Sequence, residues 1–155
     1  MTPVSRRQGF TLIEMLVTMA VIGILFSIAA LSFQRLDNPV QDGVTELSSF
    51  LKQTRATALS TTSAYRLAIS TDSTTLTATT APSCATAASS WTADPATKLT
   101  LPNTVVISSI TGGTWPICIT SRGFSTQDVI LTLTGSNTTT GKVELLIGGG
   151  TKVNP

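Results

Sequence analysis

The strongest constraint on this chain is an apolar stretch close to its N-terminus. Residues 15–33, MLVTMAVIGILFSIAALSF, contain no charged side chain. A helix needs about 20 predominantly apolar residues to cross a hydrocarbon core of roughly 30 Å, so this stretch is long enough to span a membrane. Arg6 and Arg7 precede it, and basic residues beside such a helix favour the cytoplasmic side. The stretch predicts a membrane-spanning helix with a cytoplasmic leader.

A carboxylate, Glu14, lies at the front of this stretch and allows three interpretations. An ordinary secretory signal has a shorter apolar core, about 7–15 residues, and SIAALS at 27–32 would be its cleavage site. A plain signal anchor has no use for an acid, which costs about 2.5–3.5 kcal/mol deep in a bilayer but less at headgroup level. In the third interpretation, Glu14 has a specific partner.

Composition restricts what the rest of the chain can do. Only 12% of the residues are charged, and histidine is absent. Without histidine, a Ser-His-Asp triad, a Cys-His pair and an H-E-x-x-H zinc helix are excluded. The aspartates lack metal-ligand spacing, and GGG at 148–150 lacks the strand-to-helix context of a phosphate-binding loop. We therefore expect no enzyme, no metal site and no cofactor.

A second helix is predicted after the apolar stretch. Apolar residues recur at three- and four-residue steps over 40–59, while polar residues fill the other faces, so one stripe should be buried. The members of this stripe are Val40, Val44, Leu47, Phe50, Leu51, Ala58 and Leu59. Pro39, in DNP at 37–39, marks either a kink in one long helix or a short gap between two.

Beyond residue 60 the pattern changes to short β-type segments separated by turn residues. The candidate strands are 65–69, 75–79, 104–110, 117–121, 129–134 and 142–147. A Pro-, Ser- and Ala-rich segment at 81–95 predicts an excursion loop, and TGSNTTTG at 134–141 predicts the connection of a terminal hairpin. An antiparallel sheet with one apolar face needs cover, which the helical stripe supplies. The expected fold class is α+β, a long N-terminal helix packed on an antiparallel β-sheet head.

The N-terminal motif carries a family resemblance. GFTLIE at 9–14, behind a short basic leader and ahead of an uncharged helix, resembles the class III signal of type IV pilins and type II secretion pseudopilins. The resemblance implies that a prepilin peptidase cleaves between Gly9 and Phe10 and that the new amine of Phe10 is methylated. It also implies that Glu14 pairs with the N-terminal amine of a neighbouring subunit. A buried carboxylate is tolerable when a cation faces it, so Glu14 would set the register between helices.

The body resembles the GspH/FimT group of minor pilins and pseudopilins. The resemblance is carried by LKQTRATALSTTSAYRLAIS at 51–70, ICITSRGFST at 117–126 and a hairpin that ends in GGGTKV at 148–153. In this group an Arg- and Ala-rich helix end leads into a strand, a later strand carries an Arg-Gly turn, and the last strand follows a Gly-rich step. The resemblance therefore implies a pilin-like head.

Some FimT-type members bind DNA during natural transformation, through arginines near a C-terminal Gly-Arg turn. In this chain that turn holds only Lys152, and Arg122 and Lys142 are the other candidate contacts. The net charge of +2 can come entirely from the two arginines of the leader, so the body gives no electrostatic argument for nucleic acid. With Glu144 among these residues, an ordinary solvated face is the competing interpretation. A DNA-binding minor pilin is kept as the alternative function.

Cys84 and Cys118 are the only cysteines and would lie outside the cytoplasm in such a protein. An even count in an oxidising compartment favours one disulfide, with free buried thiols as the alternative. The bridge would tie the 81–95 loop to a central strand and, in the chain-entropy model, contribute roughly 3–4 kcal/mol. Trp91 and Trp115 are expected to anchor the core or loops rather than stack on bases.

These features predict three segments: a prepilin leader at 1–9, a transmembrane and filament-core helix at 10–36, and a soluble head at 37–155. The expected function is a structural subunit of a pilus or a type II secretion pseudopilus. The partners implied are other pilin or pseudopilin subunits, the prepilin peptidase and an inner-membrane assembly platform. The expected location is the bacterial cytoplasmic membrane, crossed once with the head outside the cytoplasm, and then the filament.

Overall fold

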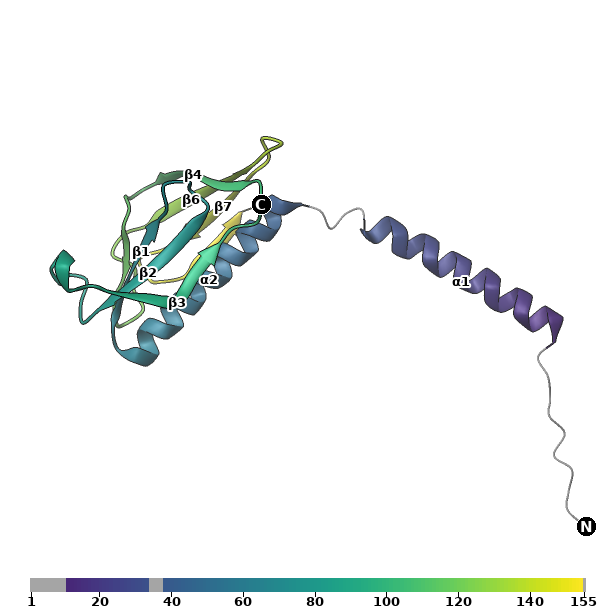
Figure 1. The fold of residues 1–155 in the computed structure, drawn as a ribbon, viewed down its shortest axis with the longest axis horizontal. Coiled ribbons are helices and arrows are strands. Elements are labelled where there is room, and N and C mark those ends of the chain that lie inside the picture. Colours follow the sequence, from purple (N-terminus) through teal and green to yellow (C-terminus); the bar gives the residue numbers. More distant parts are fainter. Residues whose placement is uncertain (1–10, 34–37, 155) are drawn as a thin grey trace, which may run out of the picture. The chain divides into compact units, whose positions relative to one another are not determined.

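The computed structural model describes residues 11–33 and 38–154, which form two separate units (Figure 1). One compact unit covers Met1–Asn38 and the other covers Pro39–Pro155. The predicted division between 36 and 37 falls within residues 34–37, outside the described residues. The described elements are two α-helices, one 3₁₀ turn and eight strands.

The first unit contains α1, Leu12–Phe33, a mainly apolar helix whose one charged residue is Glu14. Between residues 12 and 26 its large hydrophobic side chains are exposed by 50–83%. A helix that is hydrophobic all round is stable only where another apolar phase surrounds it. Among the described residues, no helix is long and apolar enough to cross a membrane.

The second unit, which we call the head, begins with α2, Pro39–Thr61. Proline at the first helical position has no amide hydrogen to leave unpaired, so Pro39 starts this helix without cost. The predicted stripe is buried, with one exception: Leu59 is 47% exposed. Leu59 lies about 100° around the helix from the fully buried Ala58 and therefore points away from the sheets.

The head contains two antiparallel four-stranded sheets, whereas the sequence predicted a single sheet. One has the strand order β3-β2-β1-β5 and the other the order β4-β6-β7-β8. The bounds are β1 Ala64–Ile69, β2 Thr75–Ala81, β3 Thr92–Thr100, β4 Val105–Thr111, β5 Ile117–Ile119, β6 Val129–Gly135, β7 Thr140–Leu145 and β8 Thr151–Asn154. The six predicted strands correspond to β1, β2 and β4 to β7.

Strand β3 corrects the prediction that 81–95 is one loop. Residue 81 still belongs to β2, and 92–95 belong to β3. This strand lies at a sheet edge and is mostly exposed, so its sequence lacks the alternation of apolar and polar residues. Asp94 also interrupts it, because its carboxylate accepts hydrogen bonds from the amide of Ala96 (3.1 Å) and the hydroxyl of Thr97 (2.7 Å). The pairing with β2 shifts at this turn.

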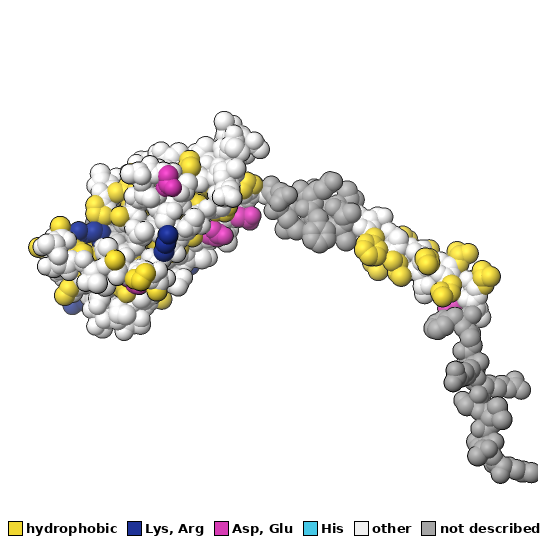
Figure 2. Space-filling model, in the orientation of Figure 1, with side chains coloured by type: hydrophobic (Ala, Val, Ile, Leu, Met, Phe, Trp, Pro, Cys, Tyr) yellow, Lys and Arg dark blue, Asp and Glu magenta, His cyan; other side chains and the backbone are white. Residues whose placement is uncertain are grey.

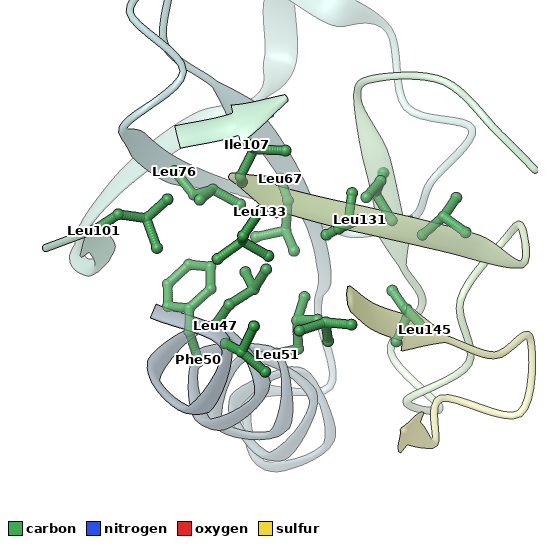
Figure 3. Close-up of a cluster of buried hydrophobic side chains, with 14 of the residues drawn as sticks. Leu47, Phe50, Leu51, Leu67, Leu76, Leu101, Ile107, Leu131, Leu133 and Leu145 are labelled. Atoms are coloured by element: carbon green, nitrogen blue, oxygen red, sulfur yellow. The ribbon is translucent and has the colours of Figure 1, made fainter. Parts of the chain in front are cut away.

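The inner faces of both sheets and the stripe of α2 form one hydrophobic core (Figure 3). Leu47 and Leu51 of α2 are 0% and 1% exposed, and Leu131 and Leu133 of β6 are fully buried beside them. The sheet approaches α2 closely where its strands carry a glycine facing the helix. A Cβ atom added to Gly141 would lie 2.5 Å from a methyl group of Val44. Glycine on β7 therefore lets the start of α2 lie directly on the sheet.

Candidate assembly site

Thr11 and Glu14 shape the first turn of α1. The amide of Glu14 donates to the Thr11 hydroxyl (3.3 Å) and to its carbonyl oxygen (3.1 Å), and the amide of Met15 donates to the same carbonyl (3.2 Å). Thr11 is thus the N-cap of the helix, and Glu14 stands at the capping-box position three residues later. The sequence carried this signal as T-x-x-E, but Thr11 was not among the predicted site residues.

The side chain of Glu14 is exposed on a surface that is otherwise apolar. Its neighbours Ile13 and Met15 are 72% and 58% exposed, and hydrophobic side chains run along the helix in Figure 2. Among the described residues, none donates a hydrogen bond to its carboxylate. The dipole of the helix N-terminus favours a negative charge here. Gly9 and Phe10, the predicted cleavage and methylation residues, lie outside the described residues.

Two hydroxyl groups of α1 are already satisfied within the helix. Thr18 donates to the carbonyl oxygen of Met15 (2.9 Å), and Ser27 donates to that of Gly23 (2.8 Å). Such back-bonding lets a hydroxyl enter an apolar environment without an unpaired donor. Along residues 12–27, Glu14 is therefore the polar group for which burial would be expensive.

The loop before β3 is the second feature of interest. The predicted disulfide attaches this loop to β5. Cys84 and Cys118 are joined, with their Cα atoms 6.0 Å apart. Trp91 adds a second attachment, because its indole Nε1 donates to the carbonyl oxygen of Thr86 (3.1 Å) and the Arg66 guanidinium lies 4.1 Å from its ring centroid. Trp91 thus anchors a loop, as predicted, and Trp115 packs at the edge of the core.

The candidate DNA contacts are only partly brought together. Lys142 on β7 and Lys152 on β8 share the outer face of their sheet, where Lys152 is directly opposite Glu144. Arg122 belongs to a different element, the turn after β5, in which the amide of Gly123 donates to the carbonyl oxygen of Thr120 (2.8 Å). An acid therefore lies between the two lysines on the sheet face.

Arg55 was not among the predicted site residues. It contacts two turns, the Arg-Gly turn after β5 and the Gly-rich turn between β7 and β8. Its Nη1 atom donates to the carbonyl oxygen of Gly149 (3.0 Å), and its side chain lies against Gly123. Both glycines have positive φ, 74° and 73°, which suits glycine best. The Arg-Gly turn and the Gly-rich step were each visible in the sequence, but a contact across 94 positions carries no local signal.

Comparison with known proteins agrees with the N-terminal motif and with the fold of the head. Residues 4–30 match the sequence model of the family described as "Prokaryotic N-terminal methylation motif". The minor pseudopilin EpsH from the type 2 secretion system of Vibrio cholerae is structurally similar, with a TM-score of 0.58 and 17% identity over 76% of this chain and 97% of that chain. The type IV minor pilin FimU of Pseudomonas aeruginosa has a TM-score of 0.59 and 16% identity over 75% and 88% of the two chains. No curated protein gives a significant match.

Residues 4–30 thus match a methylation-motif family, and the head has the fold of a minor pseudopilin and of a minor pilin. The comparisons give the DNA-uptake alternative no specific support.

Proposed function

We propose that this chain is a minor pilin or pseudopilin subunit of a type IV pilus or a type II secretion pseudopilus. Prepilin peptidase removes residues 1–9, and the amine of Phe10 is then methylated. Segment 10–36 holds the subunit in the bacterial cytoplasmic membrane, with head 37–155 outside the cytoplasm. An inner-membrane assembly platform moves the subunit into the filament.

The observation that carries this proposal is α1 itself, an apolar rod with one carboxylate in its first turn. Its large hydrophobic side chains between residues 12 and 26 are 50–83% exposed, so this helix presents an apolar surface that a bilayer or neighbouring helices can cover. A bilayer and a bundle of neighbouring helices are both apolar, and transfer between them need not expose this surface to water. The same helix therefore serves for storage and for assembly.

Glu14 gives the bundle its register. In a bundle of such helices an unpaired carboxylate is expensive to bury, whereas a carboxylate facing a cation at a helix start is tolerated. The cation is the methylated amine of Phe10 on the neighbouring subunit. A helix displaced along its neighbour would bury both charges unpaired, so only one axial position is favoured.

Replacing Glu14 tests the proposal. In the native host, Glu14→Ala should reduce the amount of chain in sheared filaments, because breaking a buried ion pair costs about 3–5 kcal/mol, more than a hundredfold in an equilibrium. The total amount of chain in the membrane should not change. The control is Lys52→Ala, which removes an exposed charge from α2. Normal incorporation of the Glu14 variant would contradict the proposed role.

A further inference from the structure

The Cys84–Cys118 bridge lies outside the hydrophobic core of the head. Cys118 is directly opposite Arg66 in the pairing of β5 with β1, and directly opposite side chains share one face of a sheet. Their neighbours Ile117 and Leu67 are fully buried in the core, so Cys118 and Arg66 lie on the outer face. The bridge therefore fastens a loop to the outside of a sheet whose inner face is packed without it.

We call residues 82–91, which connect β2 to β3, the bridged loop. Its side chains are exposed except for half-buried Cys84, Thr86 and Trp91. The loop is uncharged and consists mainly of Ala and Ser, and Figure 1 shows it projecting beyond the strands that it connects. Such a segment buries too little apolar surface to hold one conformation by packing alone.

Two contacts attach the bridged loop to the sheet in the described part of the chain. One is the bridge, and the other is the Trp91 ring, whose centroid lies 4.1 Å from the guanidinium carbon of Arg66. The hydrogen bonds of the loop are internal: the amide of Thr86 donates to the carbonyl oxygen of Ser83 (3.1 Å), and the Trp91 indole donates to that of Thr86 (3.1 Å). Trp91 directly precedes β3, so its ring holds only the last residue of the loop. The bridge holds the remainder, including the 3₁₀ turn Ala88–Ser90.

A dithiol reductant can open this bridge by thiol–disulfide exchange. One thiolate of the reductant attacks the Sγ atom of Cys84, because this residue is half-buried whereas Cys118 is only 7% exposed, and the Sγ atom of Cys118 leaves as a thiolate. The second thiolate of the reductant then attacks the mixed disulfide and releases the Sγ atom of Cys84. Two electrons pass to the protein, its two thiolates take up protons, and the reductant is left as a disulfide.

We propose that the Cys84–Cys118 bridge is a redox-sensitive latch for the bridged loop. In the oxidised head the latch holds the loop against the outer face of β5. A dithiol releases the loop, while the two sheets and α2 stay together because their shared core includes neither cysteine. The redox state of the surroundings thereby changes one exposed surface of the head without changing its fold. The latch is independent of the role of α1 in assembly.

Reduction without denaturant tests whether the latch can open. The full-length chain in detergent micelles is incubated with dithiothreitol, the reductant is removed at low pH, and free thiols are labelled with N-ethylmaleimide in denaturant. Intact mass should show two labelled thiols after this treatment and none in the untreated chain. A bridge that opens only after the chain has been denatured would overturn the proposal.

Elastase cleavage measures the release of the loop. Elastase cuts after small side chains, and the loop offers three exposed alanines: Ala85, Ala87 and Ala88. A double Cys84→Ser, Cys118→Ser variant leaves the latch open without any reductant, so the disulfides of the protease stay intact. Cleavage within the bridged loop should be about tenfold or more faster in this variant than in the unchanged chain.

Two controls show whether the release is local. Segment 136–139, the exposed turn between β6 and β7, should be cut at equal rates in both chains. Amide hydrogen exchange should find β6 and β7, the central strands of their sheet, still protected in the variant over the time in which the loop is cut. Equal cleavage of the bridged loop in both chains would show that the bridge does not hold it. Loss of protection across β6 and β7, or a variant that does not fold, would show that the bridge supports the core, and either result overturns the proposal.

Discussion

The Nη1 atom of Arg55 in α2 donates a hydrogen bond to the main-chain carbonyl oxygen of Gly149, 3.0 Å away. This bond fastens the end of the long head helix to the turn between β7 and β8. Arg55→Ala should lower the free energy of unfolding of the head by about 1–3 kcal/mol, the usual range when a charged group loses its hydrogen bond. Denaturant titration measures the change. Lys52→Ala, at an exposed position one turn earlier, should change stability by less than about 0.5 kcal/mol.

Gly149 itself should tolerate no side chain. Its φ is 73°, and a Cβ atom there would lie 1.9 Å from the carbonyl oxygen of Gly123. Gly149→Ala should therefore cost more than about 1 kcal/mol through backbone strain and displacement of the Arg-Gly turn. The adjacent Gly148 has open space at the Cβ position, so Gly148→Ala is the matched control. Equal melting temperatures for the two variants would contradict this description of the turns.

The α2 stripe should carry much of the stability of the head. Leu47 is fully buried, and Leu47→Ala should cost about 2–5 kcal/mol because it removes contacts and leaves a cavity. Leu59→Ala, on the exposed side of the same helix, should change stability by only about 0.5 kcal/mol. Urea unfolding of both variants gives the comparison. A large effect at Leu59 alone would place the core on the wrong face of α2.

The disulfide should stabilise the head through the loop it closes. Cys84 and Cys118 are 34 positions apart, which corresponds to about 3–4 kcal/mol in the chain-entropy model. A double Cys84→Ser, Cys118→Ser variant should unfold at lower denaturant concentration and become insensitive to reductant. A thiol count on denatured, non-reduced protein gives an independent check, and two reactive thiols would contradict the bridge.

Asp72 should make the β1–β2 turn sensitive to acid. A hydrogen bond from the Ser70 hydroxyl, followed by hydrogen bonds from Thr74, lowers the pKa of this exposed carboxyl group. A lowered pKa in the folded state stabilises the fold above the unfolded pKa of about 3.9, and this stabilisation is lost as the pH falls through the folded value. Asp72→Asn should therefore be less stable than the unchanged chain at pH 7, with the difference shrinking below about pH 4. Melting temperatures measured across this range test the sign.

Much of the fold was predictable because its signals are local. The apolar run of α1, the periodic stripe of α2 and the alternating strands β1, β2, β4, β6 and β7 each follow from neighbouring residues. Strand β3 was missed because an exposed edge strand needs no apolar face and because Asp94 and Pro95 read as turn residues. The division into two sheets was missed because β1 pairs with β5 across a long segment, and local patterns do not determine such pairing.

The candidate sites also divide into those with a local sequence signal and those that form only through long-range contacts. The motif at 9–14 and the two cysteines are visible in the sequence because their chemistry depends on residue type and spacing. The contacts of Arg55 depend on turns that meet only after folding. Leu59 shows the limit most clearly, because it continues the apolar pattern of α2 and yet lies outside the core.

If Glu14 faces an amine that is created when the leader is removed, the mature chain begins at Phe10, and its mass shows whether it does. Intact-mass and N-terminal peptide analysis of the chain from native membranes should give a start at Phe10 with one added methyl group. A chain that retains residues 1–9, or that begins beyond Ser32 as a freely secreted protein, would contradict the account.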